Sequence, residues 1–265
     1  MMNELLRVMA QLRDPETGCP WDRAQDSRSL IPYLLEESYE VVEILEQKAL
    51  DPAALRDELG DLLFQVVFHS RVAEEQAWFD FSAVAAGITE KLVRRHPHVF
   101  EDAGLGHDPA RWDAIKASER QAAGKAAGVL AEVPVALPAL ARADKLGRRA
   151  ARVGFDWRAA GDVLAKVREE LTEVEDALAA GESVARVEEE LGDVLFAAAQ
   201  LARFLDLDAE TALRRANAKF VKRFAWVEQQ LAVDGLKPEP DHLARMETLW
   251  EQAKRLEIEG ASDAG

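Results

Sequence analysis

Apolar residues recur along this chain at the spacing that places them on one face of an α-helix. The clearest stripes are formed by Leu59, Leu62, Leu63, Val66 and Val67 in the first half and by Leu191, Val194, Leu195 and Ala198 in the second. No segment shows a convincing alternation of apolar and polar residues, which would indicate a half-buried strand. The pattern therefore predicts an all-α protein in which each stripe lies against the core of a small helical bundle.

Four short motifs occur in the same order in both halves, which indicates a duplicated unit. The first half contains LLEESYE (34–40), DELGDLLF (57–64), EKLVRR (90–95) and WDAIK (112–116). The second half contains VREELTE (167–173), EELGDVLF (189–196), AKFVKR (218–223) and WEQAK (250–254). We therefore expect two tandem helical-bundle domains, residues 1–120 and 139–265. A linker is expected at residues 121–138, where Ala and Gly are frequent and prolines interrupt helix formation.

The charge of the chain limits the partners that we expect. The 265 residues include 49 acidic and 33 basic side chains, which gives a formal net charge of -16. Because this charge repels nucleic acids and anionic membrane surfaces at long range, neither is an expected partner. The single cysteine, Cys19, cannot form an intramolecular disulfide, and no run approaches the roughly 18 apolar residues of a membrane-spanning helix. Without a signal-peptide pattern at its start, the sequence predicts a cytoplasmic protein.

Pairs of acidic residues border the apolar stripes of two predicted helices in each half. The pairs are Glu37 with Glu40, Glu58 with Asp61, Glu170 with Glu173 and Glu190 with Asp193. Residues three apart share a helix face, so an antiparallel pair of helices can bring two acidic pairs face to face. Four anions at a half-buried seam repel one another, and a divalent cation relieves this repulsion. Because every ligand is an oxygen, we expect Mg²⁺, with Mn²⁺ as the alternative.

The acidic pairs also have a simpler interpretation. In an acidic chain, a Glu-x-x-Glu pair on a helix is most often a solvated face, and Glu36, Glu169, Glu188 and Glu189 fit that description. The recurrence of all four acids at the core edge in both halves favours metal binding over this interpretation.

Basic and aromatic residues form two further kinds of residue pair that recur in both halves. Lys91 and Arg95 are four apart, as are Lys219 and Arg223, so each pair shares a helix face and suggests recognition of a polyphosphate. Ordinary ion pairing with the many glutamates is the alternative. The second kind of pair consists of a tryptophan and a lysine four residues apart, Trp112 with Lys116 and Trp250 with Lys254. A tryptophan there either stacks on a nucleobase or anchors the core.

Taken together, these motifs resemble the MazG family of nucleoside triphosphate pyrophosphohydrolases in its tandem-domain form. The most specific pieces are GCPWD (18–22), EESYE (36–40), ELGD (58–61 and 190–193), RRHPHVF (94–100), VGFDW (153–157) and EELTE (169–173). The resemblance implies an all-α, Mg²⁺-dependent homodimer, with contacts through helices, that hydrolyses a nucleoside triphosphate (NTP) to the monophosphate (NMP) and pyrophosphate.

The resemblance also implies roles for particular residues. Metal ligation carries over to the eight paired acids, and the catalytic set of the second domain is Glu169, Glu170, Glu173, Glu190 and Asp193. Nucleotide contact carries over to Lys219, Arg223, Trp250 and Lys254, with Lys116 as a candidate from the first domain, where Lys91 and Arg95 match Lys219 and Arg223 by position. Because Asn217 and Phe220 are matched by Thr89 and Leu92, we expect the second domain to perform most of the hydrolysis.

Two points stay open from the sequence. The first is which glutamate accepts a proton from the attacking water as the general base, with Glu169 and Glu170 as candidates. The alternative to an enzyme is a non-catalytic helical interaction module whose acidic ridges bind a basic partner.

Overall fold

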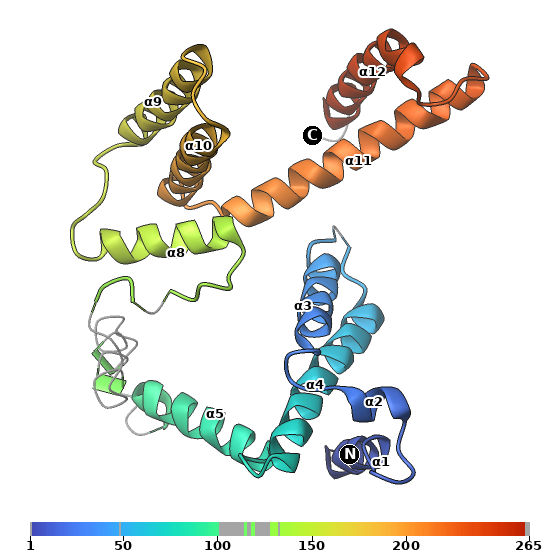
Figure 1. The fold of residues 1–265 in the computed structure, drawn as a ribbon, viewed down its shortest axis with the longest axis vertical. Helices are drawn as coiled ribbons and strands as arrows, with labels where there is room; N and C mark the ends of the chain where they lie inside the picture. Colours follow the sequence, from blue (N-terminus) through green and yellow to red (C-terminus); the bar gives the residue numbers. More distant parts are fainter. Residues whose placement is uncertain are drawn as a thin grey trace. The chain divides into compact units, whose positions relative to one another are not determined.

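The computed structural model describes residues 2–47, 49–100, 114–115, 118–119, 128–131 and 133–262 (Figure 1). Within these ranges every regular element is a helix and no residue forms a β-strand, which confirms the predicted all-α class. The chain divides into two compact units, Met1–Gly124 and Lys125–Gly265, called the first and the second unit below. The expected linker, 121–138, lies partly outside the described residues. Among the helices described, none has both the length and the apolar content needed to cross a membrane.

The first unit is built around the hairpin of α3 (Ile31–Leu45) and α4 (Pro52–Glu75). Asp51 begins α4 as a cap, because its side chain accepts hydrogen bonds from the backbone N–H groups of Ala53 and Ala54. Around the hairpin lie α1 (Met2–Leu12), α2 (Pro20–Ala24), α5 (Phe81–Arg95) and α6 (Pro97–Phe100). Helices α1 and α5 pack on α4, and the core contains Met9, Leu30, Val67, Phe68 and Val72.

The second unit contains two hairpins that diverge from α8 (Ala139–Ala151), as Figure 1 shows. One hairpin consists of α9 (Ala160–Ala179) and α10 (Val184–Phe204), the most extensive helix pair of the unit. The other consists of α11 (Ala209–Val233) and α12 (Leu243–Ser262), with the short 3-10 helix η2 (Pro240–His242) between them. Its core is formed by Val227, Leu231 and Leu249. Ser183 and Asp208 cap α10 and α11 through their side chains.

Most of the predicted apolar stripe on α4 is open to solvent. Leu59, Leu63 and Val66 are 48%, 36% and 38% exposed, whereas Val67 and Phe68 are buried. The second unit repeats this at Leu191 and Leu195, which are 51% and 53% exposed. The predicted helices are confirmed, but the prediction that the whole stripe is buried within one chain is wrong. In the first unit the core packs against the side of α4 that carries Val67 and Phe68, which leaves most of the stripe outside the core.

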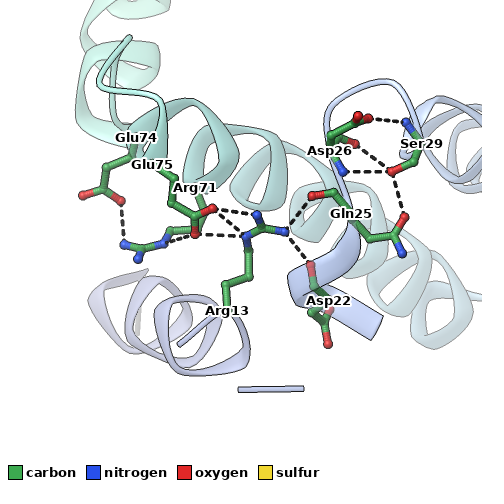
Figure 2. A network of polar contacts seen from close by, with 8 residues as sticks. All are labelled: Arg13, Asp22, Gln25, Asp26, Ser29, Arg71, Glu74 and Glu75. Atoms are coloured by element: carbon green, nitrogen blue, oxygen red, sulfur yellow. Dashed lines mark hydrogen bonds and ion pairs between the residues drawn. The ribbon is translucent and has the colours of Figure 1, made fainter. Parts of the chain in front are cut away.

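A buried arginine fastens the loop before the acidic hairpin of the first unit. The guanidinium of Arg13 pairs with the carboxylate of Glu75 at 2.6 Å and donates to the carbonyl oxygens of Asp22 and Gln25, as Figure 2 shows. It also lies 5.4 Å from the centroid of the Phe68 ring. The arginine directly follows the last residue of α1, and the carboxylate belongs to α4.

The second unit reverses this arrangement. Here the buried arginine is Arg203 on α10, and its carboxylate partner at 2.5 Å is Asp156 in the loop before α9. Arg203 also donates to the side chain of Gln200, which in turn donates to the carbonyl oxygen of Ala143 on α8. Gly147 makes room for this network, since a Cβ added there would lie 1.8 Å from Oε1 of Gln200.

Candidate active site

The hairpin of α9 and α10 brings the predicted acids of the second unit together. The turn between the helices contains Gly181 with φ of 66°, a left-handed conformation that glycine adopts without strain. Carboxylate oxygens of Glu170, Glu190 and Asp193 lie within 4.8 Å of one another. Glu170 and Glu190 are only 5% and 3% exposed, so two of the three carboxylates are buried.

Glu173 completes this group. Partial desolvation, followed by the negative charges of Glu170 and Glu190, raises the pKa of Glu173 above its ordinary value. The sequence therefore placed all four acids of the second unit correctly on facing helices. We call Glu170, Glu173, Glu190 and Asp193 the second carboxylate cluster.

The first unit holds an equivalent group. Carboxylate oxygens of Glu37, Glu40 and Glu58 lie within 4.8 Å of one another across α3 and α4. Desolvation is the largest cause of the raised pKa of Glu37 and of Glu58, and the charges of Glu40 and Asp61 add to it in both cases. Glu37, Glu40, Glu58 and Asp61 form the first carboxylate cluster.

Two cations accompany the second cluster, and the sequence analysis missed both. Nζ of Lys166 lies 2.7 Å from Glu170 and 2.8 Å from Glu169, and these contacts raise the pKa of Lys166. Arg186 forms ion pairs with Glu190 and, at 3.0 Å, with Glu189. The signal was available, because each cation stands four residues before a buried acid.

The first cluster lacks these cations. The positions four residues before Glu37 and Glu58 are occupied by Tyr33 and Ala54. The Tyr33 ring instead packs edge-on against Trp21, with 5.5 Å between the ring centroids. The carboxylates of the first cluster therefore repel one another without a lysine or arginine at the equivalent positions.

The predicted nucleotide contacts of the second unit lie on its other hairpin. Lys219 and Arg223 belong to α11, and Trp250 and Lys254 belong to α12. The Arg223 guanidinium lies 5.8 Å from the Trp250 ring, and Lys254 pairs with Glu251 at 2.6 Å. Trp250 and Lys254 line a groove of about 570 Å³ between α11 and α12, whereas Lys219 and Arg223 are not among its lining residues. The acids and these contacts thus lie on different hairpins of one chain (Figure 1).

The structure describes only some of the nucleotide-contact residues predicted for the first unit. Lys91 and Arg95 lie on α5, as expected. Arg94 and Arg95 both pair with the carboxylate of Glu119 at 2.5 Å, and these two guanidinium groups lower the pKa of Glu119 to about 2. Lys116 and Trp112 lie outside the described residues.

Comparison with known proteins identifies relatives of this chain. A model of the MazG nucleotide pyrophosphohydrolase domain matches residues 25–100 and 160–227, segments that contain both carboxylate clusters. The nucleoside triphosphate pyrophosphohydrolase of Escherichia coli K12 is 47% identical over 263 residues, which cover 97% of this chain and 98% of that protein. The nucleoside triphosphate pyrophosphohydrolase/pyrophosphatase MazG of Thermotoga maritima is 42% identical over 254 residues, 96% of each chain.

A more distant relative is the nucleoside triphosphate pyrophosphohydrolase of Mycobacterium tuberculosis, 34% identical over 86% of this chain and 59% of that protein. The family model and the near full-length relatives confirm the resemblance that the motifs indicated. This chain belongs to the MazG nucleotide pyrophosphohydrolase family.

Proposed function

We propose that the protein is a Mg²⁺-dependent nucleoside triphosphate pyrophosphohydrolase that converts an NTP and water into NMP and pyrophosphate. The observation that carries the proposal is the second carboxylate cluster, in which buried Glu170 and Glu190 face each other across two helices with Asp193 beside them. The buried acids each have one cation at hand, Lys166 or Arg186, so the site combines groups for a metal with groups for a phosphate.

The donor set fits a hard divalent cation. It consists of carboxylate oxygens within 4.8 Å of one another, without a thiolate or an imidazole. Glu170, Glu173, Glu190 and Asp193 would hold Mg²⁺, with Mn²⁺ as a substitute, and the first cluster offers the equivalent ligands. When bound, the ion supplies positive charge that polarises phosphate oxygens and lowers the pKa of a nearby water.

The side chains of the second unit have distinct tasks in the reaction. Glu169, an exposed acid outside the cluster, accepts a proton from the attacking water, while Glu170 serves as a ligand. The water oxygen forms a bond to the α-phosphorus, and the bond from that phosphorus to the α,β-bridging oxygen breaks. The electron pair leaves with pyrophosphate, whose negative charge Lys219 and Arg223 offset.

Lys166 and Arg186 act on the substrate side of the cluster. In the absence of a ligand they neutralise Glu170 and Glu190. Once these carboxylates bind a cation, the ammonium and guanidinium groups are available for phosphate oxygens.

We also propose a homodimer. The exposed stripe residues of α4 and α10 form apolar faces beside the carboxylate clusters, and a second copy would remove them from water. Because the two hairpins of the second unit diverge, the α11–α12 hairpin of one copy would reach the carboxylates of the other. This arrangement unites the acids with Lys219 and Arg223.

One assay tests the function. The protein is incubated with NTPs and Mg²⁺, and the products are separated. NMP and pyrophosphate support the proposal, whereas NDP and phosphate would indicate a phosphatase. The absence of turnover, together with no stabilisation by Mg²⁺, would favour an acidic interaction module.

A further inference from the structure

The groove between α11 and α12 carries charges of opposite sign at separate points along its length. It follows α12 from Leu243 to Lys254, about three helical turns. Lys254 stands at one end, and Glu247 lines the groove two turns earlier. Glu251 pairs with Lys254 at 2.6 Å, whereas Glu247 has no ion pair or hydrogen bond within the described part of the chain. The Glu247 carboxylate is therefore available to a ligand.

The middle of the groove presents flat aromatic surfaces. The Phe220 and Phe224 rings are parallel to within 5°, with centroids 6.1 Å apart, and the Trp250 ring lies 5.1 Å from Phe220. Phe220 is 57% exposed, so its ring is open to an incoming group. Such surfaces stack on nucleobases, since every base has a π face. Arg223, over the Trp250 ring, and Lys254 provide positive charge for the phosphates of the same nucleotide.

We propose that Glu247 makes this groove selective for guanine. The inference rests on the proposed function and names the base that the same site prefers. An ionised carboxylate only accepts hydrogen bonds, and guanine offers two adjacent donors, N1–H and the 2-amino group. One carboxylate can therefore receive two parallel N–H···O bonds from guanine, the geometry that makes bidentate pairs strong and specific.

The other bases match a carboxylate less well. Adenine and cytosine place a ring-nitrogen acceptor beside their amino group, and that lone pair repels the second carboxylate oxygen. Uracil and thymine have one N–H between two carbonyl acceptors. Guanine forms two favourable hydrogen bonds with the carboxylate, whereas each other base forms one hydrogen bond and suffers one repulsion. This difference favours guanine.

Comparison of GTP with ITP tests the inference, because inosine differs from guanosine only in lacking the 2-amino group. We expect the parent protein to hydrolyse GTP with a kcat/KM about tenfold above that for ITP, since a lost hydrogen bond to a charged group has roughly this effect. In Glu247→Ala the GTP/ITP ratio falls to about one. Glu228→Ala is the matched control, because Glu228 is an exposed glutamate of α11 that does not line the groove. Its GTP/ITP ratio stays at the parent value.

Two results would overturn the inference while leaving the proposed function intact. One is equal kcat/KM for GTP and ITP in the parent, the outcome also expected if a second copy of the chain fills the groove. The other is a GTP/ITP ratio that Glu247→Ala does not change. If neither nucleotide yields NMP and pyrophosphate, the proposed function fails and the inference fails with it.

Discussion

The two carboxylate clusters differ in what surrounds them. In the second unit Lys166 and Arg186 neutralise the buried acids, and in the first unit Tyr33 and Ala54 occupy those positions. The first unit also holds Arg94 and Arg95 against Glu119. The same acidic motif thus stands beside cations in one unit and beside an aromatic side chain in the other. The shared positions of the acids along the chain therefore do not make the two units chemically equivalent.

The largest expected difference between the units comes from removing one carboxylate from each cluster. Asp193→Asn should lower kcat for NTP hydrolysis by about 100-fold or more, because it removes one of the proposed metal ligands of the second cluster. Asp61→Asn, the matched change in the first unit, should lower it less than about twofold. Pyrophosphate release reports the rates, and circular dichroism checks that both variants keep the helical content. Equal losses in the two variants would show that both units turn over substrate.

A mixing experiment tests whether the second site draws on both copies of a dimer. We expect Asp193→Asn and a Lys219→Ala/Arg223→Ala variant to have little activity alone, whereas their mixed dimer would contain one site with intact acids and intact cations. After random exchange, activity should recover to about a quarter of the parent value, because about half of the dimers are mixed.

The control for this mixing experiment pairs Asp193→Asn with Glu190→Gln. Neither site of that mixed dimer has intact acids, so no activity should return. A native gel confirms subunit exchange. No recovery in the first mixture despite exchange would place the whole site within one chain.

The cations beside the second cluster should have a smaller effect. Lys166→Ala should lower kcat/KM about tenfold, since it removes one charge-assisted contact to the triphosphate. Tyr33→Lys makes the reverse change in the first unit by introducing a lysine at the position equivalent to Lys166, and it should leave the rate within about twofold of the parent. Steady-state hydrolysis of one NTP at fixed Mg²⁺ measures both. A parent-like rate in Lys166→Ala would restrict this lysine to neutralising Glu170.

The smallest effects concern stability in metal-free buffer, where the two units should respond with opposite signs. Glu37→Gln should raise Tm by about 2 °C, because it removes one of the repelling charges of the first cluster. Glu170→Gln should lower Tm by a similar amount, because it breaks the contact with Lys166. Thermal unfolding with a chelator measures both changes, and shifts of the same sign would contradict the comparison.

The pH dependence of the Glu37 effect has a defined sign. Its folded-state pKa is raised above the ordinary value of 4.5, so the charged form destabilises the fold. This penalty is present at neutral pH and diminishes as the pH falls through the folded-state pKa toward 4.5. The stabilisation by Glu37→Gln should therefore shrink over that interval.

Local regularities made much of this structure predictable. The stripe spacing identified α4 and α10, and the spacing of the acids placed Glu37 near Glu58 and Glu170 near Glu190. These features depend on neighbours within two helical turns and on one short connection. Lys166 and Arg186 were predictable by the same rule but were overlooked.

Other features depend on tertiary packing, which spacing does not encode. The stripe marks Leu59 and Leu63 as apolar, but the side of α4 that the core covers is set by α1 and α5. The α11–α12 hairpin likewise points away from the acids because of how α11 packs against α8 and α10. The spacing of the stripe therefore predicts the helix and its apolar side, but it does not predict which element packs against that side.

The reversed arginine pairs restrict which segments of the two halves can be exchanged. A hybrid that joins the start of the first unit to α10 would bring Arg13 toward Arg203 and omit Glu75, leaving two buried cations without enough acid. The reciprocal hybrid would set Gly147 of α8 against α4, where Phe68 and Arg71 stand in place of Gln200 and Arg203, and Glu75 would lose its contact with Arg13. We therefore expect recombination between the duplicated halves to be tolerated only when an entire unit moves together with its own arginine–carboxylate pair.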